Sequence, residues 1–227
     1  MKNLINFPEN IKDKKVLIIS EDCLLSEGFL SSAVEFKADV TISNFQNFKS
    51  ISNELVKTKW DIIIFHPFSL DIDFNDKNIE TSIVENYIKI FFLDFVPSLI
   101  NKCSVMSLLP LDFYNSYSNR TTISSLCGFI HGYVKSLSIE LASKSIRTNS
   151  AILGYIEGDR VFSYESTFNS NKNRSPIQRA PEISELTLPV LFLASDSADF
   201  ATGSSYAIDG GWSSTWGFDT TVKYPTD

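Results

Sequence analysis

The sequence has few glycines, histidines and cysteines. Of its 227 residues, nine are glycine, two are histidine and three are cysteine. So little glycine argues against a flexible linker or a collagen-like repeat. An odd number of cysteines without CxxC spacing, together with only two histidines, argues against a disulfide framework and against a zinc site. The most apolar run, residues 87–100, has 14 residues with two charges, well short of the roughly 20 apolar residues of a membrane span.

Positive charge is also scarce. Twenty basic and 27 acidic side chains give a net charge of −7, and the basic residues form no cluster. Such a surface repels phosphate backbones, so nucleic acids and anionic membranes are poor partners. The first 15 residues contain no apolar core of the kind a signal peptide needs, and we therefore expect a reducing, cytoplasmic compartment.

Apolar residues make up 43% of the chain and include 18 phenylalanines. This composition predicts one packed domain over residues 1–227, with residues 213–227 as a C-terminal tail.

Apolar runs of strand length alternate with helical patterns. The expected strands are residues 15–20, 39–43, 61–65, 104–109 and 148–153, and the expected helices end at Glu35, span 81–101 and 124–144, and begin at Ser184. This alternation predicts an α/β fold, a Rossmann-like doubly wound parallel sheet in three α/β/α layers. Its crossovers are expected to be right-handed, and its ligand crevice lies at the carboxyl ends of the strands.

The C-terminal half resembles a known family. The segments that carry the resemblance are Ser136-Leu-Ser-Ile-Glu-Leu-Ala142, Ile146-Arg-Thr-Asn149, Gly154-Tyr-Ile-Glu157, the Pro-Glu helix start at Pro181, and the run from Phe192-Leu-Ala-Ser-Asp196 through Thr202-Gly203 to Asp209-Gly-Gly-Trp212. Over residues 130–212 these segments are similar to the short-chain dehydrogenase/reductase family. The resemblance implies a Rossmann fold that holds a nicotinamide dinucleotide and reduces carbonyls.

The dinucleotide motif of that family is not matched. Its TGxxxGxG turn places glycines where the backbone meets the pyrophosphate, and the corresponding positions here are Ser20, Leu24 and Ser26. Glu21, Asp22 and Glu27 stand beside them. Two anionic groups about 5 Å apart repel by about 3 kcal/mol at an effective dielectric constant near 20. We therefore expect no bound dinucleotide, and we expect these acids to favour the start of a helix through its dipole.

Two further cofactor positions differ from the family. Asn44 stands where an acidic or basic residue would meet the adenosine ribose, and His66-Pro67-Phe68 replaces an NAG motif. Only 17 residues separate Ser43 from Asp61. That interval fits one helix, so the sheet should be one strand and one crossover shorter than is usual in the family.

The family's catalytic Tyr, Lys and Ser are not matched either. Counted back from Ser136 without gaps, these positions fall on Ile123, Cys127 and Pro110, none of which can donate a proton as Tyr or Lys does. A helix Asn of the family has a counterpart in Asn86 at one of two possible spacings.

Other residues offer alternative chemistry. Tyr114, Tyr117 and Arg120 lie in the loop before the expected Tyr position, where a shifted register would make a Tyr-xx-Arg pair a proton donor. Cys127 and His131 are four residues apart on one helix and so share a face, as a thiolate–imidazole pair would require. Against this, loop tyrosines usually cover an apolar edge, and a buried Cys and a core His are common.

The two long helices correspond to those that build four-helix interfaces between subunits of the family, and their apolar residues include Phe91, Phe92, Phe95, Phe129, Leu137 and Leu141. The first hypothesis is therefore a pseudoenzyme, a non-catalytic subunit that assembles with itself or with an active relative. The alternatives are a cofactor-independent lyase, dehalogenase or isomerase that uses the vacated crevice, as in the similar halohydrin dehalogenases, and a diverged NAD(P)-dependent oxidoreductase. A crevice filled by Leu24 and Phe side chains would favour the first hypothesis, and a pocket lined by the alternative residues would favour the second.

Overall fold

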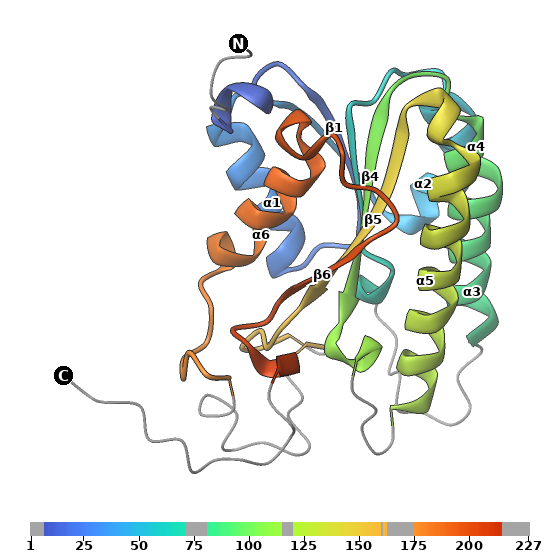
Figure 1. Ribbon diagram of the computed structural model, residues 1–227. Coiled ribbons are helices and arrows are strands. Elements are labelled where there is room, and N and C mark those ends of the chain that lie inside the picture. The colour runs from blue at the N-terminus through green and yellow to red at the C-terminus, as the bar shows by residue number, and fades with distance from the viewer. Residues whose placement is uncertain (1–6, 71–80, 115–119, 160, 163–174, 215–227) are drawn as a thin grey trace.

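Six parallel strands form one sheet in the order β2-β1-β3-β4-β5-β6 (Figure 1). The computed structural model describes residues 7–70, 81–114, 120–159, 161–162 and 175–214. The strands are β1 (Lys15–Ile19), β2 (Asp39–Ser43), β3 (Ile62–Phe65), β4 (Cys103–Pro110), β5 (Ile146–Leu153) and β6 (Ser205–Ile208). The five strands expected from apolar runs are confirmed to within two residues at each end. The predicted three-layer α/β fold is confirmed as well.

Helices cover both faces of the sheet. Helices α1 (Leu24–Glu35) and α6 (Ile183–Ala194) lie together on one face (Figure 1). The other face carries α2 (Phe45–Leu55), α3 (Thr81–Lys89), a π-helical segment (Ile90–Phe95), α4 (Val96–Ser98) and α5 (Thr121–Glu140). Short 3-10 turns occupy Pro8–Asn10, Pro67–Ser69, Leu111–Phe113, Ala142–Lys144, Asp196–Ala198 and Trp212–Ser214.

In the part of the chain that the structure describes, the sheet has no counterpart of the third strand of the common dinucleotide-binding arrangement. That arrangement has the strand order 3-2-1-4-5-6, with the third strand outside the second. Here β2 is the edge strand, and the chain passes through α2 alone before entering β3 on the other side of β1. The short interval between Ser43 and Asp61 therefore produces the missing strand and crossover that it predicted.

The last crossover departs from the expected right-handed rule. The sheet order runs in one direction from β3 to β6, so the connections through α5 and α6 step the same way. Yet α5 and α6 lie on opposite faces (Figure 1). Two crossovers that step in the same direction but pass over opposite faces of the sheet have opposite handedness. Since α5 follows the right-handed preference, the passage through α6 is left-handed.

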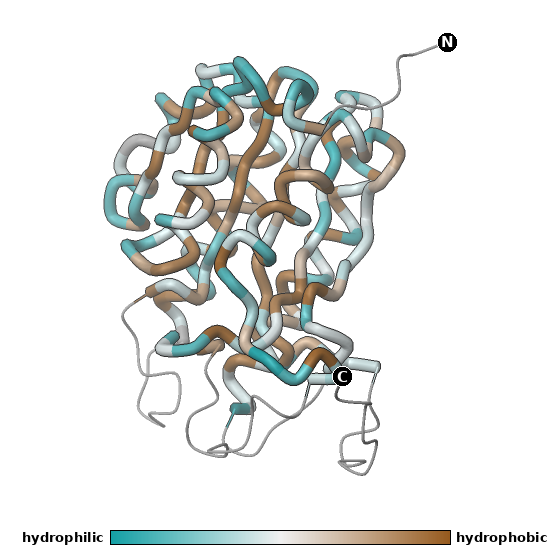
Figure 2. Tube along the Cα trace, turned by 90° about the vertical axis from the view of Figure 1, so that its left-hand side faces the viewer, coloured by the Kyte–Doolittle hydropathy of each residue, from teal (hydrophilic) through white to brown (hydrophobic). Residues whose placement is uncertain are grey.

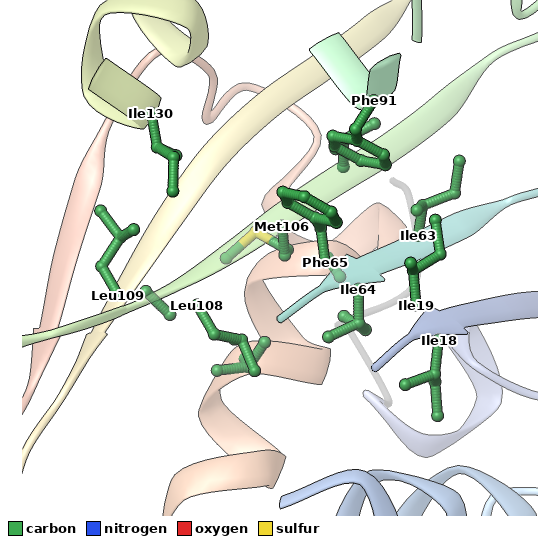
Figure 3. Close-up of a cluster of buried hydrophobic side chains, with 14 of the residues drawn as sticks. Ile18, Ile19, Ile63, Ile64, Phe65, Phe91, Met106, Leu108, Leu109 and Ile130 are labelled. Carbon is green, nitrogen blue, oxygen red and sulfur yellow. The ribbon is translucent and has the colours of Figure 1, made fainter. Parts of the chain in front are cut away.

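Aromatic and branched side chains fill the space between the sheet and the helices. All four residues of β3 are buried, and the ring of Phe65 stacks on that of Phe91 with centroids 3.8 Å apart (Figure 3). Hydrophobic residues concentrate on the central strands (Figure 2). The core also takes up most of the residues expected to build subunit contacts, namely Phe91, Phe92, Phe95, Leu137 and Leu141. They pack inside this chain, and only Phe129 of that set is partly exposed.

Helices α1 and α6 touch at Gly28. A Cβ atom built on Gly28 would lie 2.1 Å from Cγ2 of Ile183. Nearby, the hydroxyls of Ser32 and Thr187 form a buried hydrogen bond of 2.8 Å. Glycine is therefore needed at this position by close helix packing rather than by a phosphate.

Candidate functional site

Because all six strands are parallel, their carboxyl ends meet at one edge of the sheet. The segments gathered there begin at Ser20 after β1, His66 after β3, Leu111 after β4 and Gly154 after β5. In doubly wound sheets this edge is where ligands bind. The chemistry of the chain therefore has to be sought among these residues.

The turn between β1 and α1 is closed by its own side chains. The Ser26 hydroxyl accepts a hydrogen bond from the Cys23 backbone N–H at 2.9 Å, and the Cys23 sulfur accepts one from the Ser26 N–H. The Glu21 N–H donates to the Ser69 hydroxyl at 2.9 Å. A phosphate bound at such a turn depends on free backbone N–H groups. These three are already used.

Side chains occupy all three expected glycine positions. Two of these side chains are buried and the third is exposed. Ser20 and Ser26 are buried, with 1% and 3% exposure. Leu24 is 46% exposed, so it projects from the first turn of α1. It does not fill the crevice in the way that would have favoured the first hypothesis.

Glu21 reaches across to the neighbouring strand. Its carboxylate accepts a hydrogen bond of 3.0 Å from the Phe45 N–H, at the start of α2. Beside it, the Asn44 side chain accepts one of 2.8 Å from the Asn47 N–H. A carboxylate at a helix N-terminus is stabilised by the helix dipole. Glu21 thus has the predicted role of an acid at a helix start, but the helix is α2, and Asn44 is its N-cap.

A buried ion pair lies at the end of β4. Arg120 donates from Nε and Nη2 to the two carboxylate oxygens of Asp112, at 2.7 and 2.8 Å, and Nη2 also donates to the Val161 carbonyl at 2.8 Å. The Asp112 side chain is fully buried. The pair ties the end of β4 to the start of α5 and to the segment after β5.

The positions of the family's catalytic residues lie in the core beside this pair. Ile123 is 1% exposed and Cys127 is fully buried, and Pro110 is the last residue of β4. Burial raises the pKa of the Cys127 thiol, and the Asp112 carboxylate raises it further, while Arg120 opposes them. Cys127 is therefore a neutral core thiol.

The alternative residues are not brought together. Tyr114 is 44% exposed, its ring meets that of Phe113 edge-on, and burial with the Asp209 charge raises the pKa of its hydroxyl. Tyr117 lies outside the described residues. Nδ1 of His131 lies 3.4 Å from the Ser205 hydroxyl, and burial, helped by Lys135, lowers the pKa of its imidazole. Within the described part of the chain, His131 forms no hydrogen bond with Cys127.

The surroundings of the other histidine, His66, were not predicted from the sequence. Nδ1 of His66 lies 3.3 Å from the Ser20 hydroxyl and 3.7 Å from the Cys23 sulfur. The imidazole is 2% exposed, and burial lowers its pKa to about 4, although the Asp159 charge opposes the shift. Residues 43 positions apart carry no local signal, and the observed pairing of β1 with β3 brings them together.

A cavity of about 310 Å³ opens between the ends of β5 and β6 and the start of α6. Its lining includes Tyr155, Asp209 and Trp212, and the exposed ion pair of Arg179 with Glu185. Of the alternative catalytic residues that the structure describes, Tyr114, Cys127 and His131 do not line it. Among the described residues there is no group of three or more His, Cys, Asp or Glu that could hold a metal ion. No helix in the same part of the chain is long and apolar enough to cross a membrane.

Comparison with known proteins finds similarity to dehydrogenases and reductases over about half of the chain. Residues 111–213 match a family model described as enoyl-(acyl carrier protein) reductase. The chain is 31% identical over 117 residues to a cyclohexanol dehydrogenase of Acinetobacter sp. and 33% identical over 119 residues to an L-xylulose reductase of Caenorhabditis elegans. These matches cover 52% and 51% of this chain, but only 43% and 45% of the relatives. The chain therefore matches less than half the length of each.

Solved structures share the fold over nearly the whole chain. A putative NAD(P)-dependent gluconate 5-dehydrogenase from Beutenbergia cavernae, with bound NADP, superposes with a TM-score of 0.78 at 13% identity, covering 92% of this chain and 100% of the other. The enoyl-acyl carrier protein reductase of Bacillus cereus, with NADP+, gives 0.75 at 14% identity, covering 91% of this chain and 99% of the other.

Proposed function

We propose that this chain, whose membership of the short-chain dehydrogenase/reductase family is well supported by the family model and the relatives, is a non-catalytic subunit that assembles with itself or with an active relative. The observation that carries the proposal is the turn between β1 and α1. Three of its backbone N–H groups are bonded to Cys23, Ser26 and Ser69 side chains, at the place where the family binds a pyrophosphate.

Electrostatics supports the same conclusion. Glu21 and Asn44 bind the N-terminus of α2, so a carboxylate stands between the ends of β1 and β2. A dinucleotide laid across this edge would bring its phosphates toward that charge, at a cost of about 3 kcal/mol for a separation near 5 Å at an effective dielectric constant of 20. The backbone N–H groups of the turn, which are already hydrogen-bonded, do not offset this repulsion.

The proton-donor positions support it as well. Ile123 has no proton to donate, and Cys127 is a buried thiol with a raised pKa. The Arg120 guanidinium, the nearest strong cation, is committed to Asp112 and the Val161 carbonyl. An activated tyrosine of the family's kind has no counterpart at this position.

The assembly face that we propose is the outer side of α3 and α5. Three apolar side chains are exposed there: Ile83 on α3 is 47% exposed, Leu93 on the π-helical segment 53% and Ile139 on α5 79%. On α5, Gly128 and Gly132 are exposed one turn apart, and a Cβ at either would meet no atom within 4 Å. Apolar residues beside small ones let a helix of another subunit approach closely.

Calorimetric titration of the purified protein with NADH and with NADPH tests the loss of cofactor binding. We expect no heat of binding up to millimolar concentration. Binding with a Kd in the nanomolar to micromolar range would overturn the proposal and support the diverged oxidoreductase.

Native mass spectrometry of the protein isolated from its own cell tests the subunit role. We expect a homo-oligomer or a complex with a co-purifying reductase, and in the second case co-expression should raise the activity or stability of that reductase. A monomer would contradict the proposal, as would a partner whose activity is the same alone. A cofactor-independent enzyme is not proposed, because Tyr114, Cys127 and His131, the alternative catalytic residues within the described part of the chain, do not line the cavity that it would use.

A further inference from the structure

Strand β2 is paired on one side of its backbone only. The Asp39 N–H donates to the Lys14 carbonyl at 2.9 Å, and the Ser43 carbonyl accepts at 3.1 Å from the residue that follows β1, so Asp39 and Ser43 direct these groups at β1. Within the part of the chain that the structure describes, no strand lies on the other side of β2. Along a strand the direction of the backbone groups alternates from one residue to the next. The N–H and C=O groups of Val40 and Ile42 therefore point away from the sheet.

The free side of β2 has few of the features that usually prevent pairing. Natural edge strands are protected by charged residues, by proline or by a bulge. Between Asp39 at its first position and Ser43 at its last, β2 contains only Val, Thr and Ile, and it keeps a one-to-one register with β1 throughout. Thr41 and Ile42 are exposed at its centre. A further strand can therefore approach this side.

The free side of β2 is complementary to a second copy of itself. A twofold axis through Thr41 makes the two strands antiparallel and sets Val40 of each copy opposite Ile42 of the other. Residues that face each other in this way exchange both hydrogen bonds, so every outward N–H and C=O of both residues gains a partner. An axis through Val40 or Ile42 instead would set the other residue against Ala38 or Asn44. The Ala38 N–H and the Asn44 carbonyl are already bonded within the chain.

The side chains of β2 fit the same register. Val40 and Ile42 lie on one face of the strand, and Val40 already packs against the core. Pairing brings these two β-branched side chains together with those of the second copy and covers Ile42. On the opposite face, the Thr41 side chains meet at the axis. Threonine pairs and β-branched pairs across antiparallel strands are both stabilising.

The charges at the two ends of β2 are complementary in this register. Lys37 precedes the strand and is exposed. At the other end, the Glu21 carboxylate accepts a hydrogen bond of 3.0 Å from the Phe45 N–H. Position 37 of one copy comes opposite position 45 of the other, so the Lys37 ammonium approaches the Glu21 carboxylate of the second copy. Asp39 comes opposite Ser43, so the paired strands do not place one carboxylate against another.

We propose that β2 pairs with β2 of a second copy of this chain, antiparallel and with Thr41 on the twofold axis, so that one sheet continues through both copies. This surface is distinct from the outer side of α3 and α5, because α5 covers β4 and β5 and β2 is the edge strand beyond β1. The inference does not rest on the subunit role, since it requires only two copies of the same chain.

Disulfide cross-linking tests the register. The background is Cys23→Ser, which leaves only the buried Cys103 and Cys127. Thr41→Cys then places two thiols across the axis at a Cα separation of about 4.5 Å, which suits a disulfide. Mild oxidation with diamide should give covalent dimers on a non-reducing gel. Asp39→Cys, exposed on the same face of the strand, is the matched control, because its two copies would lie about 14 Å apart. Equal dimer yields in the two variants overturn the proposal.

Blocking the edge tests the assembly. Ile42→Lys places a charge among the apolar side chains of the pair, while the exposed position accepts it in the single chain. In light scattering the variant should have about half the wild-type mass, and Ile100→Lys, at an isoleucine exposed elsewhere, should have the full mass. Circular dichroism verifies that both variants are folded. A mass that Ile42→Lys leaves unchanged overturns the proposal.

Gly132→Gln separates this inference from the subunit role, because it alters the outer side of α5 and not β2. A mass lowered by Gly132→Gln but not by Ile42→Lys overturns pairing through β2 and leaves the subunit role standing. A mass lowered by Ile42→Lys supports pairing through β2, whether or not Gly132→Gln lowers it too.

Discussion

Arg120 and Asp112 form a two-point ion pair, with N–O distances of 2.7 and 2.8 Å, and the Asp112 side chain is fully buried. The pair stands beside Cys127, where the family's active site would lie. The two opposite charges are thus buried together, and the hydrogen-bonding groups of each side chain are directed at the other. Its role is to hold β4, α5 and the segment after β5 together.

Removing one partner of this pair should be costly. Asp112→Ala removes the carboxylate that the buried Arg120 guanidinium binds at two points, and the loss of one partner of a buried pair costs about 3–5 kcal/mol of unfolding free energy. The measurement is urea denaturation followed by circular dichroism. The matched control is Arg179→Ala, which removes the partner of exposed Glu185 and should leave the unfolding free energy almost unchanged. Equal losses for the two variants would mean that burial of the first pair is unimportant.

Enlarging a glycine of α5 should affect assembly and leave the fold intact. The Cβ of a residue at position 132 meets nothing within 4 Å in the single chain, so Gly132→Gln should fold at least as well as the wild type, with a gain of up to about 1 kcal/mol in helix propensity. If a second subunit packs on this face, the longer side chain should lower the mass of the complex in light scattering. Ser184→Gln, at an exposed position of α6, is the control. An unchanged mass for Gly132→Gln would move the interface elsewhere.

His66 should make stability fall in mild acid. Its folded-state pKa of about 4 lies below the ordinary imidazole value of 6.5, so as the pH drops below 6.5 the unfolded chain takes up a proton that the folded chain does not. The stability present above pH 6.5 is therefore lost progressively down to about pH 4, by about 3 kcal/mol in total.

This loss is measured by urea unfolding at pH 7.5 and 4.5. His66→Asn should flatten the difference, while His131→Asn, whose imidazole pKa is lowered too, should flatten it less because that ring is only partly buried. A difference that is the same in His66→Asn and the wild type would assign the acid sensitivity to other groups.

Gly28→Ala should destabilise the packing of α1 on α6. The added methyl would overlap Cγ2 of Ile183 at 2.1 Å, and overpacking of this kind costs about 1–3 kcal/mol, more than the roughly 1 kcal/mol gained in helix propensity. Thermal unfolding provides the measurement, with Ser31→Ala on the exposed side of the same helix as control. The double variant Gly28→Ala/Ile183→Ala should recover part of the loss, since the two side chains interact directly. Purely additive effects would rule out the predicted overlap.

The sheet could be predicted closely because its strands are buried on both faces. Runs such as 61–65 are apolar at nearly every position, which is typical of parallel strands covered by helices. The missing third strand also followed from chain length alone, because 17 residues cannot hold a helix, a strand and a second helix. The left-handed passage through α6 could not be predicted, because no local pattern records the face on which a helix packs.

The site was less predictable for the same reason. Attention to the family's positions led to Ile123 and Cys127, which the fold buries, and to Leu24, which it leaves exposed. The contact between Cys23 and His66 joins residues from two different strand ends, and it depends on how the turn after β1 folds back on itself. Side-chain hydrogen bonds of that kind follow from the tertiary arrangement rather than from spacing.

The absence of a third strand has a consequence for the outer margin of the sheet. Strand β2 pairs with β1 along one side only, and its Ile42 is 37% exposed. Among the described residues no strand pairs with its other side, and an edge of this kind is one onto which an extended segment of a second polypeptide can add by continuing the ladder. The loss of one strand thus leaves a sheet edge that a strand of a neighbouring polypeptide can extend.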